Sequence, residues 1–287
     1  MDGVVKVNKP LLYTSMECVE EVKESLQVSK AGHTGTLDPH AEGLLLVCLN
    51  SATKLVPFLT DLDKEYIGEA VLGFKTSTGD RGGVITEEIR KRVSVKELLK
   101  AMEKFKGKIL QIPPMYSAVK VRGKRLYEYA RKGIDDVKLA PREISVYEFD
   151  LLSFEKDGEL QKFRFKIRCS KGTYVRRIIE DIGEELGTGA FLYYLKRTRI
   201  GPFDLVDAAS PWDKEALIHS YMSLEDVLSK IMPVLNLSID EAKRISSGNP
   251  IKRAFEEEGF LALAFKEEVL AIAEKKGDII KPVRILK

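Results

Sequence analysis

The chain has 287 residues, of which 44% are apolar and 32% are charged, and its net charge is +3. This composition supports a well-packed core and excludes wholesale disorder, and the near-neutral balance excludes a histone-like polycation. At about 150 residues per domain, the length indicates one large domain or two unequal ones.

The N-terminal segment predicts a strand followed by a helix. Val4–Val7 has strand character, and Thr14–Glu17 has the pattern of a capping box, in which a hydroxyl and a carboxylate cap one helix end. Apolar residues continue from there at helical spacing, at Met16, Val19, Val22 and Leu26. We expect residues 31–43, which contain three glycines and a proline, to form a loop.

The next part of the chain predicts two strands and a second capped helix. Leu44–Leu49 and Tyr66–Phe74 have strand character. Ser94–Glu97 is a capping box, and the helix that follows it is expected to bury Val95, Leu98, Leu99, Met102 and Phe105.

Two further strands and a helix are predicted between residues 144 and 187. Residues 144–155 and 163–169 have strand character, and alternation in the second places Phe163, Phe165 and Ile167 on one face. The helix is expected to end near Gly187, and its apolar positions are Val175, Ile178, Ile179, Ile182 and Leu186.

The sequence pattern changes from about Met232 onward. Ser238–Glu241 is a third capping box, and three short apolar runs after it predict small strands. We infer a compact β-rich module of roughly 55 residues, joined near Pro233. The predicted domains are therefore residues 1–230 and 231–287.

The sequence predicts a cytoplasmic protein. No apolar run approaches the ~20 residues of a transmembrane helix, and the first residues lack the apolar stretch of a signal peptide. Cys18, Cys48 and Cys169 are odd in number and far apart, so we expect reduced core residues and neither a disulfide nor a metal site.

Several familiar motifs are absent. The chain has no phosphate-binding P-loop, no GxGxxG after a strand, no GxSxG elbow and no CxxC. His33, His40 and His219 have no familiar zinc spacing with the cysteines. Nucleotide hydrolysis, dinucleotide redox chemistry and zinc deamination therefore lack their usual signatures.

The most distinctive segment is the loop Gly32–Pro39. Its glycines allow close approach of the backbone to a substrate, and its proline stiffens the chain after Asp38. Asp38 is a candidate catalytic carboxylate, with His33 five residues before it. The alternative for Asp38 is an ordinary turn residue, and for His33 a histidine that satisfies local backbone groups.

Basic residues are concentrated in two stretches. Residues 116–133 hold six basic residues, one glutamate and three interleaved tyrosines, and residues 162–177 hold seven basic residues and no acidic one. Basic and aromatic residues together suit a phosphate backbone and unstacked bases. The alternative is a pair of solvated faces.

Four blocks of sequence resemble one family. The chain carries GHTGTLDPHAEGLLLVCL (32–49), KEYIGEAVLG (64–73), PPMYSAVKVRGKRLYEYARKG (113–133) and CSKGTYVRRIIEDIGEELGTGA (169–190). In this order they resemble the TruB-type tRNA pseudouridine synthases, which act on uridine 55 of tRNA. The resemblance covers nearly the whole chain. One departure lies in residues 8–15, where Leu11 or Leu12 replaces a glycine that the family usually has.

The resemblance implies a fold and a domain order. It implies an α+β pseudouridine-synthase domain with a central mixed, mainly antiparallel sheet flanked by helices. A small β-rich PUA-like RNA-binding domain would follow at the C-terminus.

The resemblance also implies residue roles. Asp38 would be the catalytic aspartate, Tyr66 would stack on the flipped uracil, and Arg176 would pair with the Asp38 carboxylate. The substrate contacts would come from His33, Tyr174, Leu195 and Asp80, and basic substrate-binding residues would be Lys120, Lys124 and Arg125.

The implied isomerisation needs neither a metal nor another cofactor. Asp38 would either attack C1′ or remove a 2′ proton to give a glycal, and the sequence leaves both routes open. The target base must first be flipped out of the T-arm stem-loop.

The implied partner is tRNA, and we expect a monomer that needs neither a guide RNA nor a membrane. The alternatives are the catalytic subunit of a guide-RNA particle and a non-catalytic RNA-binding protein on the same scaffold.

Overall fold

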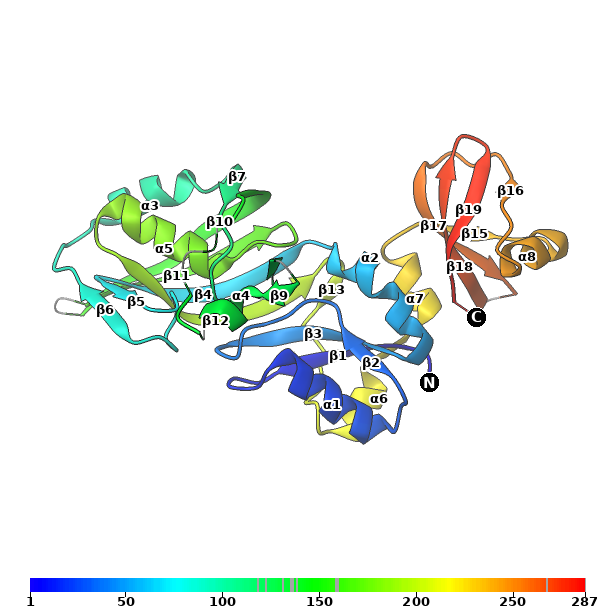
Figure 1. Ribbon diagram of the computed structural model, residues 1–287, viewed down its shortest axis with the longest axis horizontal. Helices are drawn as coiled ribbons and strands as arrows, with labels where there is room; N and C mark the ends of the chain where they lie inside the picture. The colour runs from blue at the N-terminus through cyan, green and yellow to red at the C-terminus, as the bar shows by residue number, and fades with distance from the viewer. Residues whose placement is uncertain are drawn as a thin grey trace. The chain divides into compact units, whose positions relative to one another are not determined.

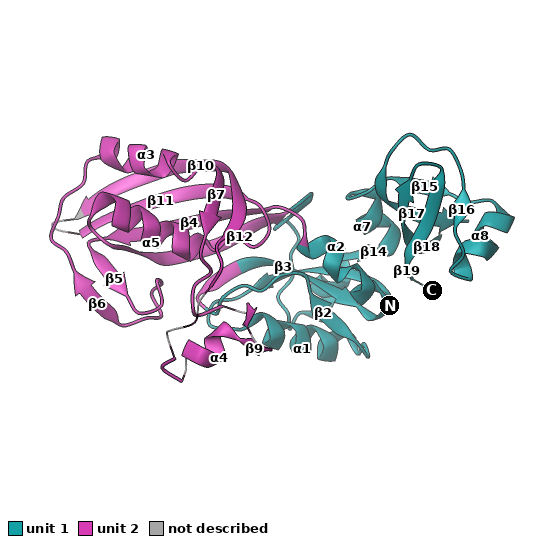
Figure 2. Ribbon diagram, turned by 45° about the horizontal axis from the view of Figure 1, so that its top comes forward, with its two compact units in different colours: residues 1–39, 43–60, 201–287 teal, residues 40–42, 61–200 magenta. Residues whose placement is uncertain are grey.

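The computed structural model describes residues 1–117, 119–121, 123–130, 132–134, 137, 139–157, 160–266 and 268–286. Its parts form two compact units (Figure 2). Unit 1 comprises residues 1–39, 43–60 and 201–287, and unit 2 comprises residues 40–42 and 61–200.

Unit 1 contains an antiparallel group of strands, in the order β14-β1-β3 with β2 beside β3. The strands are β1 (Gly3–Lys9), β2 (Ala31–His33), β3 (Ala41–Leu49), β13 (Phe203–Asp204) and β14 (Tyr221–Ser223). The helices are α1 (Ser15–Leu26), the 3-10 helix η1 (Asn50–Leu55), α2 (Val56–Thr60), α6 (Lys214–His219) and α7 (Leu224–Ser229). Buried side chains of β1, β3, α1 and α6 pack into one apolar cluster that includes Val5, Val19, Val47 and Leu217.

The C-terminal part of unit 1 has its own five-stranded sheet, in the order β15-β17-β18-β19-β16. The elements are β15 (Val234–Asn236), α8 (Ile239–Ser246), β16 (Ile251–Lys252), β17 (Gly259–Phe265), β18 (Glu268–Lys276) and β19 (Ile279–Ile285). Among the described strand pairs of this sheet, β15 and β17 run parallel and the others run antiparallel. Apolar side chains of this sheet and of α8, all between residues 235 and 285, pack into a separate cluster. The predicted boundary at residue 230 stays a prediction.

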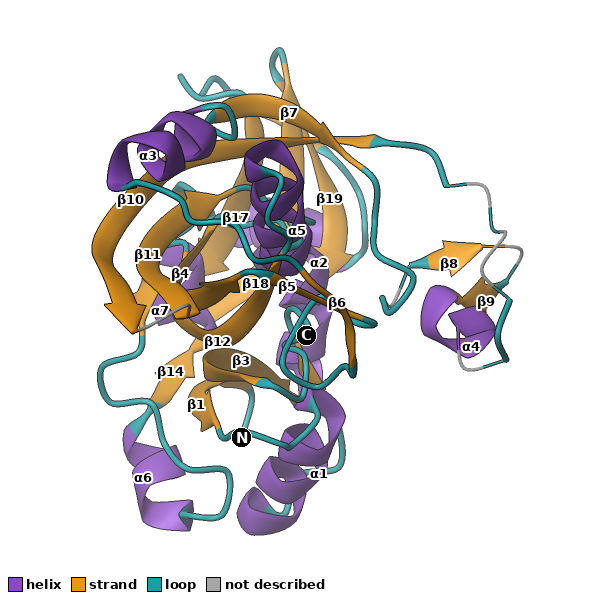
Figure 3. Cartoon of the chain, turned by 90° about the vertical axis from the view of Figure 1, so that its left-hand side faces the viewer, coloured by secondary structure: helices purple, strands orange, loops and turns teal. Residues whose placement is uncertain are grey.

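Unit 2 is an antiparallel sheet in the order β12-β4-β11-β10-β7. Helices α3 and α5 pack against each other and over this sheet (Figures 1 and 3). The long elements are β4 (Lys64–Leu72), α3 (Val95–Glu103), β7 (Gly107–Gln111), β10 (Arg142–Asp157), β11 (Leu160–Cys169), α5 (Val175–Leu186) and β12 (Ala190–Ile200). The short elements are β5 (Phe74–Thr76), β6 (Ile85–Glu88), β8 (Lys120–Val121), β9 (Lys124–Arg125) and α4 (Leu126–Ala130).

The structure confirms the α+β class and most predicted elements. The capping boxes at Thr14, Ser94 and Ser238 are all formed, and α5 ends at Gly187 in the left-handed conformation. The alternation predicted for residues 163–169 is confirmed, because Phe163, Phe165 and Ile167 are fully buried. The three cysteines are free and buried, as predicted.

Three local predictions were wrong. Residues 31–43 are not one loop, because residues 31–33 form β2, which pairs with the end of β3, and β3 already begins at Ala41, so only residues 34–40 lie between the two strands. The predicted strand Tyr66–Phe74 breaks at Gly73, whose φ of 96° only glycine adopts without strain. Met16, Val95 and Leu99 are exposed, since neighbouring positions on α1 and α3 provide the buried face.

Candidate active site

Asp38 lies in the short connection between β2 and β3. The connection begins where the pairing of β2 with β3 ends, at His33. Thr34 adds one more hydrogen bond to this pairing, because its amide donates to the Leu46 carbonyl at 3.1 Å. His33, at the end of β2, accepts a hydrogen bond from the Gly35 amide at its Nδ1 (3.3 Å). Asp38 is half-buried, whereas Leu37 before it is buried. The loop therefore presents one carboxylate on an ordered backbone.

The turn before α1 anchors this connection on both sides of Asp38. The Ser15 hydroxyl accepts from the Leu37 amide at 2.8 Å and donates to the Leu37 carbonyl at 3.2 Å. The Leu12 amide donates to the Pro39 carbonyl at 2.7 Å. Leu12 has a φ of 68°, which lies in the left-handed region that favours glycine.

The buried side chain of Lys9 supports that turn from inside. Its ammonium donates to the carbonyls of Pro10, at 2.8 Å, and Tyr13, at 2.5 Å, on either side of Leu12. A buried ammonium needs such partners, because an uncompensated buried charge is costly. These hydrogen bonds hold the turn around Leu12, whose left-handed conformation leucine does not favour by itself.

Arg176 lies in the first turn of α5. Gln111 fixes the residue before the helix, since its side-chain amide bonds both the amide of Tyr174, at 2.8 Å, and the carbonyl of Tyr174, at 3.1 Å. The Arg176 side chain is buried. Nη1 donates to the Thr78 carbonyl at 2.9 Å and Nη2 donates to the Tyr116 carbonyl at 3.1 Å. Its orientation is therefore set by the backbone of two loops.

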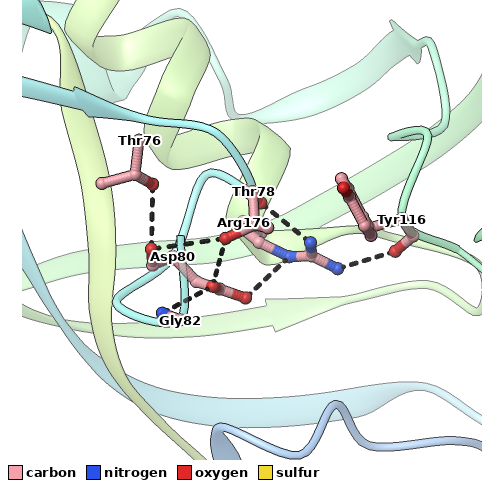
Figure 4. A network of polar contacts seen from close by, with 6 residues as sticks. All are labelled: Thr76, Thr78, Asp80, Gly82, Tyr116 and Arg176. Carbon is pink, nitrogen blue, oxygen red and sulfur yellow. Dashed lines mark hydrogen bonds and ion pairs between the residues drawn. The ribbon is translucent and has the colours of Figure 1, made fainter. Parts of the chain in front are cut away.

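Asp80 completes this network (Figure 4). Its Oδ2 lies 3.6 Å from Arg176 Nε, and its Oδ1 accepts from the Thr78 hydroxyl at 2.6 Å and the Gly82 amide at 2.9 Å. Both charged side chains are almost fully buried, which strengthens their attraction. The loop also pairs with β12, because the Arg81 amide donates to the Leu192 carbonyl at 3.0 Å.

Arg177, the next residue along α5, makes different contacts. Its guanidinium lies 2.6 Å from Asp181 and 3.8 Å from Glu180, both half-buried residues of its own helix. The assignment of the buried role to Arg176 is consistent with this difference.

Tyr66 and Leu195 share one face of the sheet. Leu195 lies opposite Gly68, and Arg197 lies opposite Tyr66, so alternate residues of β12 face alternate residues of β4. Tyr66 and Leu195 are each 8% exposed. Both side chains are therefore largely buried on the same face of the sheet.

Arg197 is a buried partner of the candidate site residue Tyr66, and the sequence analysis missed it. It is 1% exposed and hydrogen-bonds the Tyr66 side chain, while burial lowers its pKa. Burial and, next, the nearby Arg197 lower the pKa of Lys64 to about 8, and the Lys64 ammonium donates to the Leu62 carbonyl at 2.5 Å. The sequence signal for this residue was the run of basic residues in β12. Simple alternation does not show which of these residues is buried.

The predicted RNA-binding residues Lys120, Lys124 and Arg125 lie on the hairpin β8–β9. All three are exposed, and within the described part of the chain none forms an ion pair with a carboxylate. Arg125 lies over the Tyr127 ring, 5.9 Å from its centroid. Two other basic residues of this stretch, Arg122 and Arg131, lie outside the described residues.

The second basic stretch, residues 162–177, differs in that most of its charges are paired. Most of its cations pair with carboxylates: Lys166 with Glu65, Arg168 with Glu148, Lys171 with Asp61 and Arg177 with Asp181. For these residues the structure supports the alternative of a solvated face.

The predicted site residues thus fall into two groups. Unit 2 brings Arg176 and Asp80 into one network, with Tyr174 two residues before Arg176, and it places Tyr66 and Leu195 on one face of the sheet. Unit 1 carries Asp38 and His33. The predicted pairing of Arg176 with Asp38 stays a prediction.

Among the residues that the structure describes, no three histidine, cysteine or acidic side chains are grouped as a metal site would require. Within the same ranges, no helix has the length and apolar character needed to cross a membrane.

Comparisons with known proteins cover the whole chain. A sequence model of the TruB family pseudouridylate synthase N-terminal domain matches residues 23–175, and one of the tRNA pseudouridylate synthase B C-terminal domain matches residues 176–234. The chain is similar to tRNA pseudouridine synthase B of Lactobacillus gasseri, at 39% identity over 100% of this chain and 98% of that protein. It is also similar to the protein of that name in Haemophilus influenzae, at 36% identity over 100% of this chain and 95% of that protein.

The same fold is found among solved structures, one of which is a chain of an H/ACA RNP bound to a substrate RNA containing 2′-deoxyuridine. The TM-score is 0.73 at 22% identity, over 99% of this chain and 85% of that one.

Proposed function

Since the chain belongs to the TruB family of pseudouridylate synthases, we propose that it isomerises uridine 55 in the T-arm of tRNA to pseudouridine. The observation that carries this proposal is the loop of Asp38, whose backbone is anchored at Leu37 and at Pro39. An ordered carboxylate at this place is what the reaction requires.

The reaction breaks the C1′–N1 bond of the uridine, turns the free uracil and forms a C1′–C5 bond. C5 loses a proton and N1 gains one, so no atoms enter or leave overall. Asp38 would begin the reaction either by attack on C1′ or by removal of a 2′ proton, and both routes remain open. The protein must hold the detached uracil while it turns.

Tyr66 and Leu195 would hold the uracil. An aromatic ring recovers part of the energy lost when a base leaves its stack. Tyr66 is anchored through its hydroxyl to the buried Arg197, which leaves the ring face for the base. Tyr174 would contribute to the same pocket, and His33 would contact the displaced nucleotides.

Arg176 would pair with the Asp38 carboxylate and keep it ionised, because a neighbouring cation favours the charged form. Asp80 and two carbonyls already orient this guanidinium. A planar guanidinium can contact two carboxylates in different directions, which an ammonium cannot do with the same geometry.

The RNA contacts would extend beyond the pocket. Lys120, Lys124 and Arg125 would contact phosphates, and residues 231–287 would form a PUA-like module on the helical part of the tRNA. We propose a cytoplasmic enzyme that acts as a monomer, without a guide RNA.

The test is incubation of the purified protein with unmodified tRNA, followed by mapping of pseudouridine. Product at position 55 without an added guide RNA supports the proposal and excludes a guide-dependent subunit. Product only with a guide RNA, or at another position, would reject it. Asp38→Asn is the matched control and should form no product, while its tRNA affinity stays close to wild type.

A further inference from the structure

Ser15 satisfies both backbone groups of the residue that precedes Asp38. A single hydroxyl accepts from the Leu37 amide and donates to the Leu37 carbonyl, at 2.8 and 3.2 Å. Ser15 is 2% exposed and Leu37 is 4% exposed, so water cannot replace these bonds readily. The Leu37 carbonyl belongs to the peptide group that leads into Asp38, and its orientation therefore fixes one side of that residue.

The other side of Asp38 is fixed by Pro39. The proline ring restricts its own φ and the backbone conformation of Asp38 before it. The Pro39 carbonyl accepts the 2.7 Å hydrogen bond from the Leu12 amide. Asp38 thus lies between two anchored residues.

Ser15 itself has little freedom. It is the first residue of α1, directly after Thr14, whose side chain accepts from the Glu17 amide while Glu17 bonds back to the Thr14 amide at 2.7 Å. The helix is secured by Cys18, Val19 and Val22, which are buried in the core of unit 1. The anchor of Leu37 is therefore as rigid as the helix.

We infer that Ser15 is a positioning residue for the isomerisation, which orients the Asp38 carboxylate through the backbone of Leu37. This inference rests on the proposed function, because it assumes that Asp38 reacts with the uridine. Small displacements of a reacting group reduce rates strongly, by roughly 100-fold for 1 Å. Loss of the anchor should therefore slow the chemical step and leave tRNA binding unchanged.

The experiment compares three variants of the full-length protein. Ser15→Ala removes the anchor, and Ser15→Cys retains the volume with a weaker donor and acceptor. Ser25→Ala is the matched control, since Ser25 lies in the same helix and donates to the Pro211 carbonyl at 3.2 Å, away from the loop. The measurements are the single-turnover rate at saturating tRNA, the dissociation constant for tRNA and the melting temperature.

We expect the rate of Ser15→Ala to fall at least about tenfold, with Ser15→Cys between it and wild type. The dissociation constants should stay within about twofold, and Ser25→Ala should react at the wild-type rate even where it melts earlier. A Ser15→Ala rate equal to that of Ser25→Ala, or a loss confined to tRNA binding, would overturn the inference. If Ser15→Ala does not fold, Ser15→Cys decides by the same criteria.

Failure of the inference is distinguishable from failure of the proposed function. An Asp38→Asn variant that still forms pseudouridine would reject the role of Asp38 itself. An inactive Asp38→Asn variant beside a fully active Ser15→Ala variant would reject only the role of Ser15.

Discussion

Arg197 and Tyr66 lie opposite each other on strands β12 and β4, and the fully buried guanidinium hydrogen-bonds the tyrosine side chain. A buried cation is stable only with partners that replace water. The tyrosine proposed to stack on the substrate therefore also serves the stability of the sheet.

Replacement of Tyr66 by Phe should destabilise the protein. The variant keeps the ring but leaves Arg197 with one hydrogen bond fewer, and hydrogen bonds to charged groups contribute about 1.5–3 kcal/mol. Urea unfolding should therefore show a loss in this range. Tyr193→Phe is the control, because Tyr193 is 41% exposed and its hydroxyl has no hydrogen bond within the described residues. Equal unfolding free energies for the two variants would contradict the anchoring of Tyr66.

Replacement of Arg176 by Lys should slow turnover by about 100-fold or more. An ammonium cannot reproduce contacts to Asp80, Thr78 and Tyr116 from one planar group. The measurement is the single-turnover rate at saturating tRNA. Arg177→Lys should stay near the wild-type rate, because Arg177 pairs only with acidic residues of its own helix among the described contacts. The reverse pattern would mean that the two roles are exchanged.

The fold was largely predictable because its signals are local. Alternation in residues 163–169 and the three capping boxes depend on neighbours a few residues apart, and the structure has them all. β2 escaped prediction because it is three residues long and is stabilised by pairing with β3 rather than by its own pattern. The predicted burial of Val95 and Leu99 was wrong for a similar reason, since packing selected which side of α3 is buried.

Replacement of Leu12 by Gly should stabilise the protein by up to about 1 kcal/mol. The left-handed conformation costs a residue with a Cβ about 1–2 kcal/mol, and the greater freedom of glycine in the unfolded chain offsets part of the gain. The side chain is 69% exposed, so little packing is lost. Leu11→Gly, at a position without a positive φ, should destabilise instead. A destabilised Leu12→Gly would show that the leucine side chain has a contact worth more than the strain.

Neutralisation of Lys120, Lys124 and Arg125 by Gln should weaken tRNA binding and leave the single-turnover rate at saturating tRNA unchanged. Each lost phosphate contact should reduce the salt dependence of binding by roughly one unit of log K per log salt. Lys108→Gln is the control, because Lys108 is already paired with Glu143 at 3.1 Å. An unchanged salt dependence in the triple variant would mean that the hairpin is a solvated surface and does not contact phosphates.

The site was predictable only in part. Asp38, Tyr66 and Arg176 lie in recognisable motifs, whereas Arg197 does not stand out from its sequence. Arg197 and Arg199 are two residues apart and would share a face in a regular strand. A register shift between them turns Arg197 inward and leaves Arg199 exposed. Such irregularities depend on the partner strand, and a single sequence does not reveal them.

The contact between Tyr13 and Trp212 gives the molecule an internal optical probe. Trp212 is the only tryptophan of the chain, and its ring meets that of Tyr13 edge-on, with 5.1 Å between centroids. Tyr13 follows Leu12, whose amide is bonded to Pro39. Because Trp212 is 46% exposed, its emission should respond to both solvent and the adjacent ring. Intrinsic fluorescence can therefore follow the turn beside Asp38 in real time, in the unlabelled protein, as tRNA arrives.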